Sequence, residues 1–265
     1  MNKLDRLKNE LKKLKSVVVA FSGGVDSSLL LKVASDVLPK DKTLAVTAAS
    51  PTYTSSELKQ AKRFASSLGV KHRIIRTDEL KDEKFIKNPV DRCYYCKREL
   101  FKKLTQIAKK DRFSSVIDAT NYDDRADYRP GSLAKKEFKV ASPLAKARFT
   151  KKDIRDHSRK MRLKTWDMPS MACLASRFPY GQKITFKNLR KISLAEEAIK
   201  KLGIKQVRVR FHGDIARIEI DKKDIKRFVK DGFYDRIINR LKSLGFLYVV
   251  LDLEGYRTGS LNEVL

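Results

Sequence analysis

The sequence has few of the residues that build disulfide-rich or zinc-finger proteins. It contains three cysteines and three histidines in 265 residues. Such an odd, small number of cysteines argues against a disulfide framework and points to thiol or metal chemistry. No stretch approaches the roughly 18 consecutive apolar residues of a membrane span. Met1 to Lys15 has the pattern of an amphipathic helix and lacks the apolar core of a signal peptide, so we expect a cytoplasmic protein without a membrane partner.

Acidic residues are scarce relative to basic ones. The chain has 32 Asp and Glu against 60 Lys and Arg, a formal net charge of +28. Such an excess attracts polyanions, so nucleic acid, nucleotides and polyphosphate substrates are candidate partners. Lysines spread along solvated helix faces also occur in proteins of hot or Lys-rich proteomes. No run of five or six basic residues concentrates the charge, so we take it only as a hint about partners.

The first half of the chain alternates strand and helix signals. Apolar runs predict strands over 15–21, 43–49, 71–76 and 115–119, and helical periodicity predicts helices over 26–38, 55–68 and 97–110. Strands separated by helices of this length imply right-handed crossovers and a parallel, doubly wound sheet. The ligand of such a sheet binds at the carboxyl ends of its strands.

The pattern changes near residue 166, where prolines and a glycine interrupt the chain. We expect a helix over 187–202, a hairpin of strands 206–211 and 215–220 with one buried face, helices over 223–230 and 234–244, and a strand over 246–251. The expected fold class is therefore α/β, with a doubly wound parallel sheet followed by a small α+β domain. We place the first domain at residues 1–165 and the linker and second domain at 166–265.

The segment after the first strand carries the strongest functional signal. Ser22-Gly23-Gly24-Val25-Asp26-Ser27-Ser28 lies between a buried strand and a helix. The glycines let the backbone approach a ligand closely, and the helix N-terminus attracts an anion. Ser22, Ser27 and Ser28 add hydroxyl donors, and Asp26 can help to hold Mg²⁺ on phosphates. An ordinary capped turn explains paired glycines, three serines and an acid less well.

This loop is not a Walker A motif, because no Gly-Lys-Ser/Thr follows it. It resembles instead the SGGxDS signature of the PP-loop (ATP pyrophosphatase) superfamily. That resemblance implies that ATP is cleaved between its α and β phosphates, which leaves AMP on the substrate and pyrophosphate in the loop. Ammonia and sulfur are the nucleophiles that the superfamily uses to displace AMP. An ammonia-using synthetase would give the cysteines no role.

The cysteines indicate sulfur as the nucleophile. Cys93 and Cys96 form a CxxC motif just before a predicted helix, and Cys173 stands further along the chain. Three thiolates on a 4Fe-4S cluster would leave one iron without a protein ligand, and that iron could carry a hydrosulfide. A structural zinc needs a fourth ligand, and no histidine has a finger-like spacing. We prefer the cluster, with zinc second, over a redox pair or inert buried cysteines.

Three blocks resemble the LarE family of sulfur transferases, which help to build the nickel-pincer nucleotide cofactor of lactate racemase. They are the SGGVDSS loop, the segment from Ala119 to Gly131, and the block from Met171 to Gly181. The resemblance implies pyridinium-3,5-biscarboxylic acid mononucleotide as the substrate, whose carboxylates become thiocarboxylates. In one branch of the family a cysteine that matches Cys173 gives up its own sulfur. With three cysteines, this chain resembles the branch that uses a 4Fe-4S cluster, and the family suggests a homo-oligomer with an unknown sulfide source.

Several charged residues are candidates for binding the nucleotide and the substrate. Asn121, Asp124 and Arg125 follow an apolar strand, where they would line the pocket, the alternative being a solvated loop with Asx turns. Arg177 could bind a substrate phosphate through its fork of donors. The resemblance places Arg208 and Arg210 near a phosphate or pyrophosphate and Glu197 and Glu219 near a metal. A solvent-exposed sheet face would explain these two arginines and two glutamates almost as well.

Two other functions fit parts of the sequence. A PP-loop tRNA thiolation enzyme could use the same cluster chemistry, and the net charge of +28 favours it. The Ala172 to Arg177 block and the lack of further CxxC pairs count against it. A non-catalytic zinc or RNA-binding module is a second alternative, and it predicts no turnover of ATP.

Overall fold

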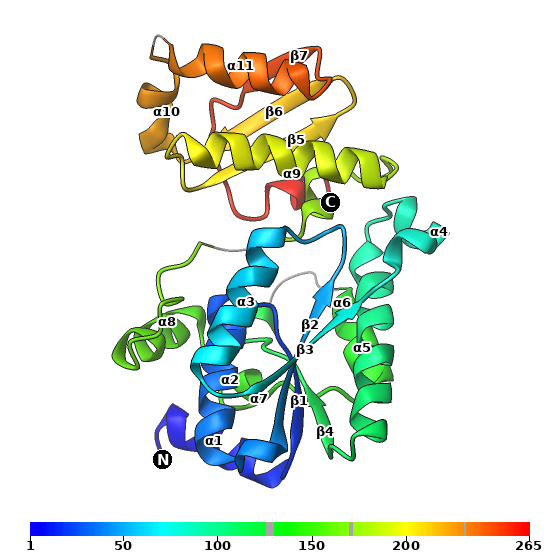
Figure 1. Ribbon diagram of the computed structural model, residues 1–265, viewed down its shortest axis with the longest axis vertical. Coiled ribbons are helices and arrows are strands. Elements are labelled where there is room, and N and C mark those ends of the chain that lie inside the picture. Colours follow the sequence, from blue (N-terminus) through cyan, green and yellow to red (C-terminus); the bar gives the residue numbers. More distant parts are fainter. Residues whose placement is uncertain (126–129, 170–171, 231) are drawn as a thin grey trace. The chain divides into compact units, whose positions relative to one another are not determined.

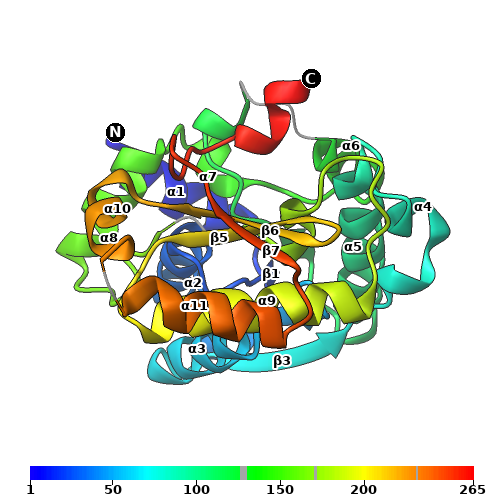
Figure 2. The same ribbon diagram turned by 90° about the horizontal axis from the view of Figure 1, so that it is seen from above.

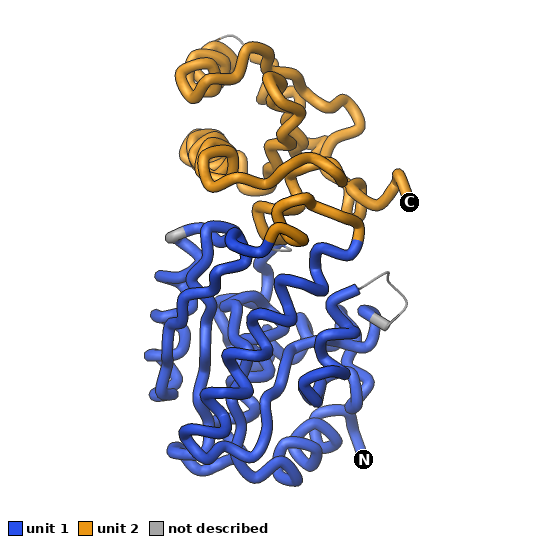
Figure 3. Tube along the Cα trace, turned by 90° about the vertical axis from the view of Figure 1, so that its right-hand side faces the viewer, with its two compact units in different colours: residues 1–82, 91–171 blue, residues 83–90, 172–265 orange. Residues whose placement is uncertain are grey.

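The chain forms two compact units, which Figure 3 shows in different colours. A computed structural model describes residues 1–125, 130–169, 172–230 and 232–265. The first unit comprises residues 1–82 and 91–171, and the second comprises residues 83–90 and 172–265. The predicted domain bounds, residues 1–165 and 166–265, stay a prediction. Residues 83–90 have no counterpart in it, because they join the second unit from within the first.

The first unit is built on a parallel sheet with the strand order β3-β2-β1-β4 (Figure 1). Its strands are β1 (Val17–Ala20), β2 (Thr43–Ala49), β3 (Lys71–Arg76) and β4 (Ser115–Ile117). In register, Val17 of β1 lies opposite Thr43 on one side and Ser115 on the other. The predicted parallel, doubly wound sheet is confirmed. Its strand order reverses direction at β1 and β4, so a ligand is expected at the carboxyl ends of these strands.

Helices cover both faces of this sheet. One face, around Val17 and Val19, packs against α1 (Lys3–Lys13), α2 (Val25–Val37), α3 (Ser55–Ser67), α7 (Pro143–Lys146) and α8 (Lys151–Lys160). The other face, around Val18, packs against α5 (Arg92–Lys110) and α6 (Gly131–Glu137). Successive side chains of a strand point to opposite faces, so an unbroken valine run suits a strand that is buried on both sides.

Two parts of the first unit differ from the sequence-based prediction. Helix α5 begins at Arg92 rather than at residue 97, so Cys93 and Cys96 lie within its first turns instead of before it. The Tyr94 N–H donates to the Asp91 carbonyl (2.8 Å), and no helix breaker separates the two cysteines. Between residues 120 and 165 the structure has α6, α7 and α8, where the sequence analysis assigned no helix.

The second unit contains a three-stranded sheet with the order β5-β6-β7. The antiparallel hairpin of β5 (Val207–His212) and β6 (Ile215–Ile220) is confirmed, and β7 (Tyr248–Leu251) pairs in parallel with β6. Helices α9 (Phe186–Lys201) and α11 (Phe233–Ser243) pack side by side along this sheet (Figure 2), and α10 (Lys222–Phe228) follows β6. Helix α4 (Glu83–Ile86) joins this unit through the Ile184 N–H, which donates to the Ile86 carbonyl (2.9 Å).

Short 3₁₀ turns complete the fold, namely η1 (Lys40–Lys42), η2 (Glu79–Lys81), η3 (Asp123–Arg125), η4 (Leu174–Arg177) and η5 (Ser260–Val264). Within the described ranges, no helix is long and apolar enough to cross a membrane.

The hairpin has two buried faces, so the alternative of a solvent-exposed face is wrong. Arg208 and Arg210 are each only 6% exposed, and Glu219 is 1% exposed. The turn η4 packs against β5, and the Arg210 guanidinium donates to the Ser176 carbonyl (2.6 Å) and the Ser260 hydroxyl (2.7 Å). Strand alternation correctly separates the arginines from the valines, but it does not reveal that another segment covers the polar side.

Candidate active site

The loop after β1 presents an open helix N-terminus. Gly23 has φ of +78°, a backbone conformation that side chains disfavour, and Gly24 precedes the first turn of α2. A Cβ atom on Gly23 would lie 3.1 Å from the Ala61 Cβ, so α3 also leaves little room for one. No side chain among the described residues caps the N-terminus of α2. Its first N–H groups and the helix dipole therefore favour an anion at this point.

The predicted serines surround the same turn. The Ser22 and Ser27 hydroxyls lie 3.0 Å apart, and the Ser27 hydroxyl donates to the Gly24 carbonyl (3.1 Å). Ser28 is fully buried, and its hydroxyl has no hydrogen-bond partner within the described part of the chain. An unpaired buried hydroxyl costs roughly 1–3 kcal/mol, which a bound water or ligand oxygen would recover.

Asp26 lies between two polar side chains from distant parts of the sequence. The Lys151 ammonium, at the start of α8, donates to Asp26 Oδ2, and Asn121 Nδ2 donates to Oδ1 (3.4 Å). The Lys151 backbone N–H donates to the Asp123 carboxylate (2.7 Å). The structure thus brings Asn121, which follows β4, to the loop that follows β1. This meeting at the carboxyl ends of two neighbouring strands is the place where such folds bind ligands.

Lys151 is a candidate functional residue that sequence reasoning missed. It begins a helix whose Thr150 and Asp153 form a reciprocal capping box, each side chain accepting a backbone N–H of the other residue. The pattern Thr150-Lys151-Lys152-Asp153 is a recognisable helix start. That signal could have placed a lysine at a helix N-terminus, although it could not have shown which residue the lysine contacts.

The segment after β4 has both the local Asx turns and the position beside the loop that the sequence analysis gave as alternatives. Asn121 Oδ1 accepts the Asp124 N–H (3.1 Å), and Asp124 Oδ2 accepts the Asn121 N–H (3.0 Å), so the expected local turns are present. Asn121 is nevertheless 3% exposed and contacts Asp26, as described above. The side chain of Arg125 lies outside the described part of the structure, so its predicted role stays a prediction.

The three cysteines form no disulfide within the described part of the chain, and they are distributed over both units. Cys93 is exposed and Cys96 half-buried, three residues apart on α5 of the first unit. Cys173 is half-buried and immediately precedes η4 of the second unit. No group of three or more His, Cys, Asp or Glu side chains is assembled for a metal among the described residues. As a donor set, three thiols still suit three irons of a cluster.

Arg177 holds the backbone on both sides of Cys173. Its Nη1 donates to the carbonyls of Ala172 (2.8 Å) and Cys173 (3.2 Å). Its Nε and Nη2 donate to the two carboxylate oxygens of Glu196 (2.8 and 3.1 Å). The geometry therefore gives Arg177 a positioning role toward Cys173 in addition to the predicted binding of a phosphate, which stays a prediction.

Glu196 is the second residue that the sequence analysis missed. It is 2% exposed, and its Oε1 also accepts the Val209 N–H of the edge strand β5 (3.1 Å). Burial alone would raise the pKa of this carboxyl, but Arg177, Arg208 and Lys200 hold it below its usual value. Glu197, the residue predicted instead from the sequence, is exposed and pairs with Lys201. The helical period of α9 could have indicated which of the two glutamates is buried.

The arginines on β5 lie in the same buried region. Arg210 forms a bidentate pair with Glu219 (2.8 and 2.9 Å), and the Arg208 guanidinium lies over the Tyr256 ring (5.4 Å). Burial, followed by the charge of Arg177, lowers the pKa of Arg208. Together with Arg177, these residues place three buried guanidinium groups beside two buried carboxylates.

Comparisons with known proteins show the family of the chain. The sequence profile of the NAD synthase family matches residues 2–92. An uncharacterised protein of Synechocystis is 42% identical over 100% of this chain and 98% of its own length. The pyridinium-3,5-bisthiocarboxylic acid mononucleotide synthase of Lactiplantibacillus plantarum is 41% identical over 96% of this chain and 92% of its own length. The chain belongs to the LarE family, that of this synthase.

LarE proteins are ATP-dependent, sulfur-inserting synthases of the PP-loop type, so the chain is an enzyme and the non-catalytic zinc or RNA-binding module is wrong. An uncharacterised protein of Methanocaldococcus jannaschii is 34% identical over 97% of the chain. The matched NAD synthase segment contains the loop, β1 to β3 and the start of α5. The resemblance inferred from the SGGVDSS loop therefore holds for the family, and the roles of single residues stay proposals.

Proposed function

We propose that the chain adenylates the carboxylates of pyridinium-3,5-biscarboxylic acid mononucleotide and converts them to thiocarboxylates, for the nickel-pincer nucleotide cofactor. The observation that carries this proposal is the open N-terminus of α2, with Asp26 held between Lys151 and Asn121. The relative from L. plantarum, which is named as a synthase of the bisthiocarboxylic acid mononucleotide, supports the same substrate.

The first step is the activation of a carboxylate. A carboxylate oxygen attacks the α phosphorus of ATP, and the bond between this phosphorus and the bridging oxygen breaks to release pyrophosphate. The N–H groups of the loop and the hydroxyls of Ser22, Ser27 and Ser28 would stabilise the negative charge of the leaving pyrophosphate. Asp26 would hold Mg²⁺, which carboxylate oxygens prefer to bind together with phosphates. Lys151, released from Asp26, would then add a second cation to the phosphates.

The second step is the replacement of oxygen by sulfur. A sulfur nucleophile attacks the acyl carbon, and AMP leaves with the oxygen that came from the carboxylate. We assign the three thiols of Cys93, Cys96 and Cys173 to a 4Fe-4S cluster, whose remaining iron would supply a bound hydrosulfide. Arg177 would keep Cys173 in place through the neighbouring carbonyl oxygens. Zinc on the same thiols is the alternative.

The mononucleotide also carries a phosphate, which needs a site of its own. The buried guanidinium groups of Arg208 and Arg210 support a phosphate site in the second unit, because the fork of donors on a guanidinium matches the oxygens of a phosphate. Asn121, Asp124 and Arg125 would contact the nucleotide near the loop of the first unit. The family resemblance also predicts a homo-oligomer, and it does not assign the source of sulfide.

The proposal is tested by anaerobic turnover with ATP and the biscarboxylic acid mononucleotide. We expect AMP and pyrophosphate by phosphorus NMR and a substrate in which sulfur replaces oxygen by mass spectrometry. ADP and phosphate as the only nucleotide products would contradict the PP-loop chemistry. For the cluster we expect about four irons per chain, lost when Cys93, Cys96 or Cys173 is changed to Ala. Undiminished sulfur transfer over many turnovers by the Cys93→Ala/Cys96→Ala variant would overturn it.

One observation favours a second substrate class, namely transfer RNA. The net charge of +28 suits a polyanion, and PP-loop tRNA thiolation would use the same activation step. Transfer RNA bound with an affinity that falls steeply with salt, together with thiolated RNA as a product, would support this alternative. Sulfur found in the mononucleotide but not in the RNA would exclude it.

A further inference from the structure

The pyrophosphate loop is attached to the neighbouring strand by a side chain. Phe21 directly precedes Ser22, and its N–H donates to the Val46 carbonyl of β2 (2.9 Å). The Thr47 hydroxyl, also on β2, donates to the Phe21 carbonyl (2.7 Å). Phe21 and Thr47 are 2% and 5% exposed, so water does not compete for this bond. The last residue before the loop is therefore bonded to β2 through both its N–H and its carbonyl.

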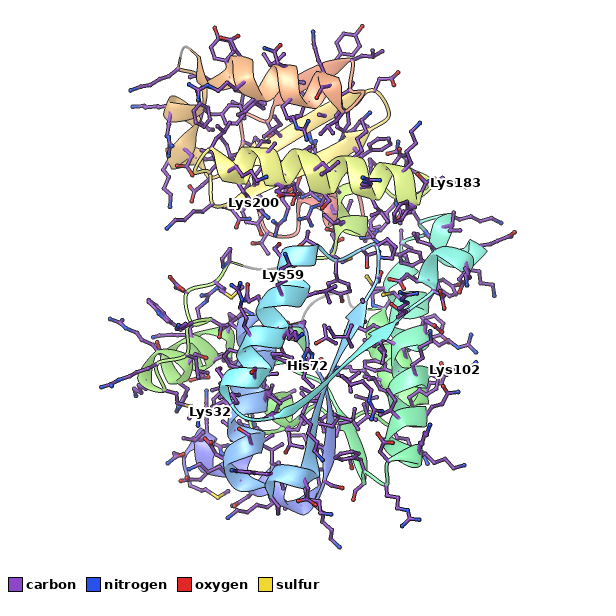
Figure 4. All side chains as sticks on the ribbon, in the orientation of Figure 1. Lys32, Lys59, His72, Lys102, Lys183 and Lys200 are labelled. Atoms are coloured by element: carbon purple, nitrogen blue, oxygen red, sulfur yellow. The ribbon has the colours of Figure 1, made fainter. Side chains whose placement is uncertain are left out.

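A second hydrogen bond orients the Thr47 hydroxyl. His72 Nε2, on the edge strand β3, lies 2.8 Å from Thr47 Oγ1. A hydroxyl has only one proton, and Thr47 gives it to Phe21, so the hydrogen of this second bond must come from His72. Burial, followed by the charge of Lys62, lowers the pKa of His72, which favours the neutral ring. In the neutral ring, the bond to Thr47 requires the hydrogen to be on Nε2. His72 is labelled in Figure 4, in the first unit.

These three residues form what we call the His72–Thr47–Phe21 relay, which crosses from β3 through β2 to the end of β1. Helix α3 supports the loop from another direction. Gln60 Nε2 donates to the Gly23 carbonyl (3.2 Å), and the Phe64 ring lies 5.9 Å from the Phe21 ring. The relay thus fixes the peptide that enters the loop, while α3 fixes the peptide at its first glycine.

The same strand shows that burial alone does not require such a bond. Thr43, at the start of β2, is 1% exposed, and its hydroxyl has no hydrogen-bond partner among the described residues. A buried threonine hydroxyl is therefore tolerated in this strand without a partner. At Thr47 the hydroxyl has two partners, and one of them is the backbone that leads into the loop.

We propose that Thr47 and His72 are positioning residues for the pyrophosphate loop. They hold the Phe21 carbonyl in one orientation, so the N–H groups that follow it keep the arrangement that binds an anion. Donors that are ordered in advance bind an anion without the entropic cost of ordering them on binding. This inference rests on the proposed function of the loop, because it concerns how the same loop is kept ready for pyrophosphate.

The test compares Thr47→Val with Thr43→Val in the full chain. Both variants replace a buried threonine of β2 with valine, a side chain of nearly the same shape, and only the first removes the relay. We measure the Kd of magnesium pyrophosphate by calorimetry and the hydrogen exchange of a peptide covering residues 21–24. Loss of one neutral hydrogen bond should raise Kd about 2- to 10-fold in Thr47→Val and speed its exchange. Thr47→Ser and Thr43→Val should stay close to the natural protein.

The outcomes separate the relay from the proposed function. Unchanged Kd and exchange in folded Thr47→Val, or equal changes in Thr43→Val, would overturn the relay. If the natural protein does not bind magnesium pyrophosphate, the proposed function fails, and hydrogen exchange alone then decides whether the relay orders the loop. Should Thr47→Val not fold, His72→Phe removes only the donor to Thr47 and keeps a ring in place. It is judged by the same two measurements.

Discussion

Replacement of Lys151 by methionine should separate stability from activity. The Lys151 and Asp26 side chains are 39% and 24% exposed. An ion pair with this exposure contributes about 0–1 kcal/mol to the free energy of unfolding, so the melting temperature should fall by no more than about 4 °C. A cation that acts on the phosphates in the transition state is worth more, about 3–4 kcal/mol, or a roughly 100- to 1,000-fold loss in kcat for AMP formation.

The assay is AMP release from ATP in the presence of the mononucleotide, with magnesium varied. Loss of the ammonium group removes the cation that competes with magnesium for Asp26, so half-maximal activity of Lys151→Met should require less magnesium. Lys152→Met is the matched control, because Lys152 is the adjacent lysine of α8 and is exposed. If Lys151→Met keeps AMP formation within about threefold of the natural protein, or Lys152→Met loses as much, Lys151 has no role in the activation step.

Three further changes test the site and its supports. Glu196→Gln should destabilise the protein by about 3–5 kcal/mol near pH 7, because Arg177 loses a buried charged partner. Because the pKa of Glu196 is lowered in the folded protein, the difference in stability between the natural protein and the variant should shrink as the pH falls below about 4.5, as measured by urea titrations. Burial alone would raise the pKa of Asp153, but hydrogen bonds from Lys3 and Thr150 lower it to about 2. Asp153→Asn should therefore be less stable than the natural protein above about pH 4, and this difference in stability should vanish toward pH 2. Gly23→Ala should abolish pyrophosphate binding measured by calorimetry, because of the φ of +78° and the contact with Ala61, whereas Gly69→Ala, at an open position with φ of +65°, should bind normally.

Local patterns in the sequence predict the fold because each strand and helix has its own signal. The valine run of β1 and the glycines after it identify both the central strand and the loop. The predicted bounds of the next two strands are those of β2 and β3 in the structure, residue for residue. The short helices after Asn121 give weaker signals, because α6 and α7 contain only 7 and 4 residues. Periodicity needs more than one or two turns to be recognised.

The candidate site was predictable only where its residues are close in sequence. The loop from Ser22 to Ser28 is one continuous motif, but Lys151 is 125 residues from Asp26, and Glu196 is 19 residues from Arg177. No spacing rule links such pairs, because the fold brings them together. The burial of Arg208 and Arg210 does not follow from the strand pattern for the same reason. Arg210 contacts Ser176 of η4 and Ser260 of η5, and Arg208 lies over the Tyr256 ring.

The contribution of residues 83–90 to the second unit has a consequence for the connection between the two units. The chain passes from one unit to the other three times, after residues 82, 90 and 171, so three covalent tethers join the units instead of one. A gene truncated at residue 171 would leave residues 83–90 without the segment that they pair with through Ile86 and Ile184. Cys93 follows the second tether and Cys173 the third, within a few residues of each. Each unit therefore has a cysteine within a few residues of a connection to the other unit in the sequence.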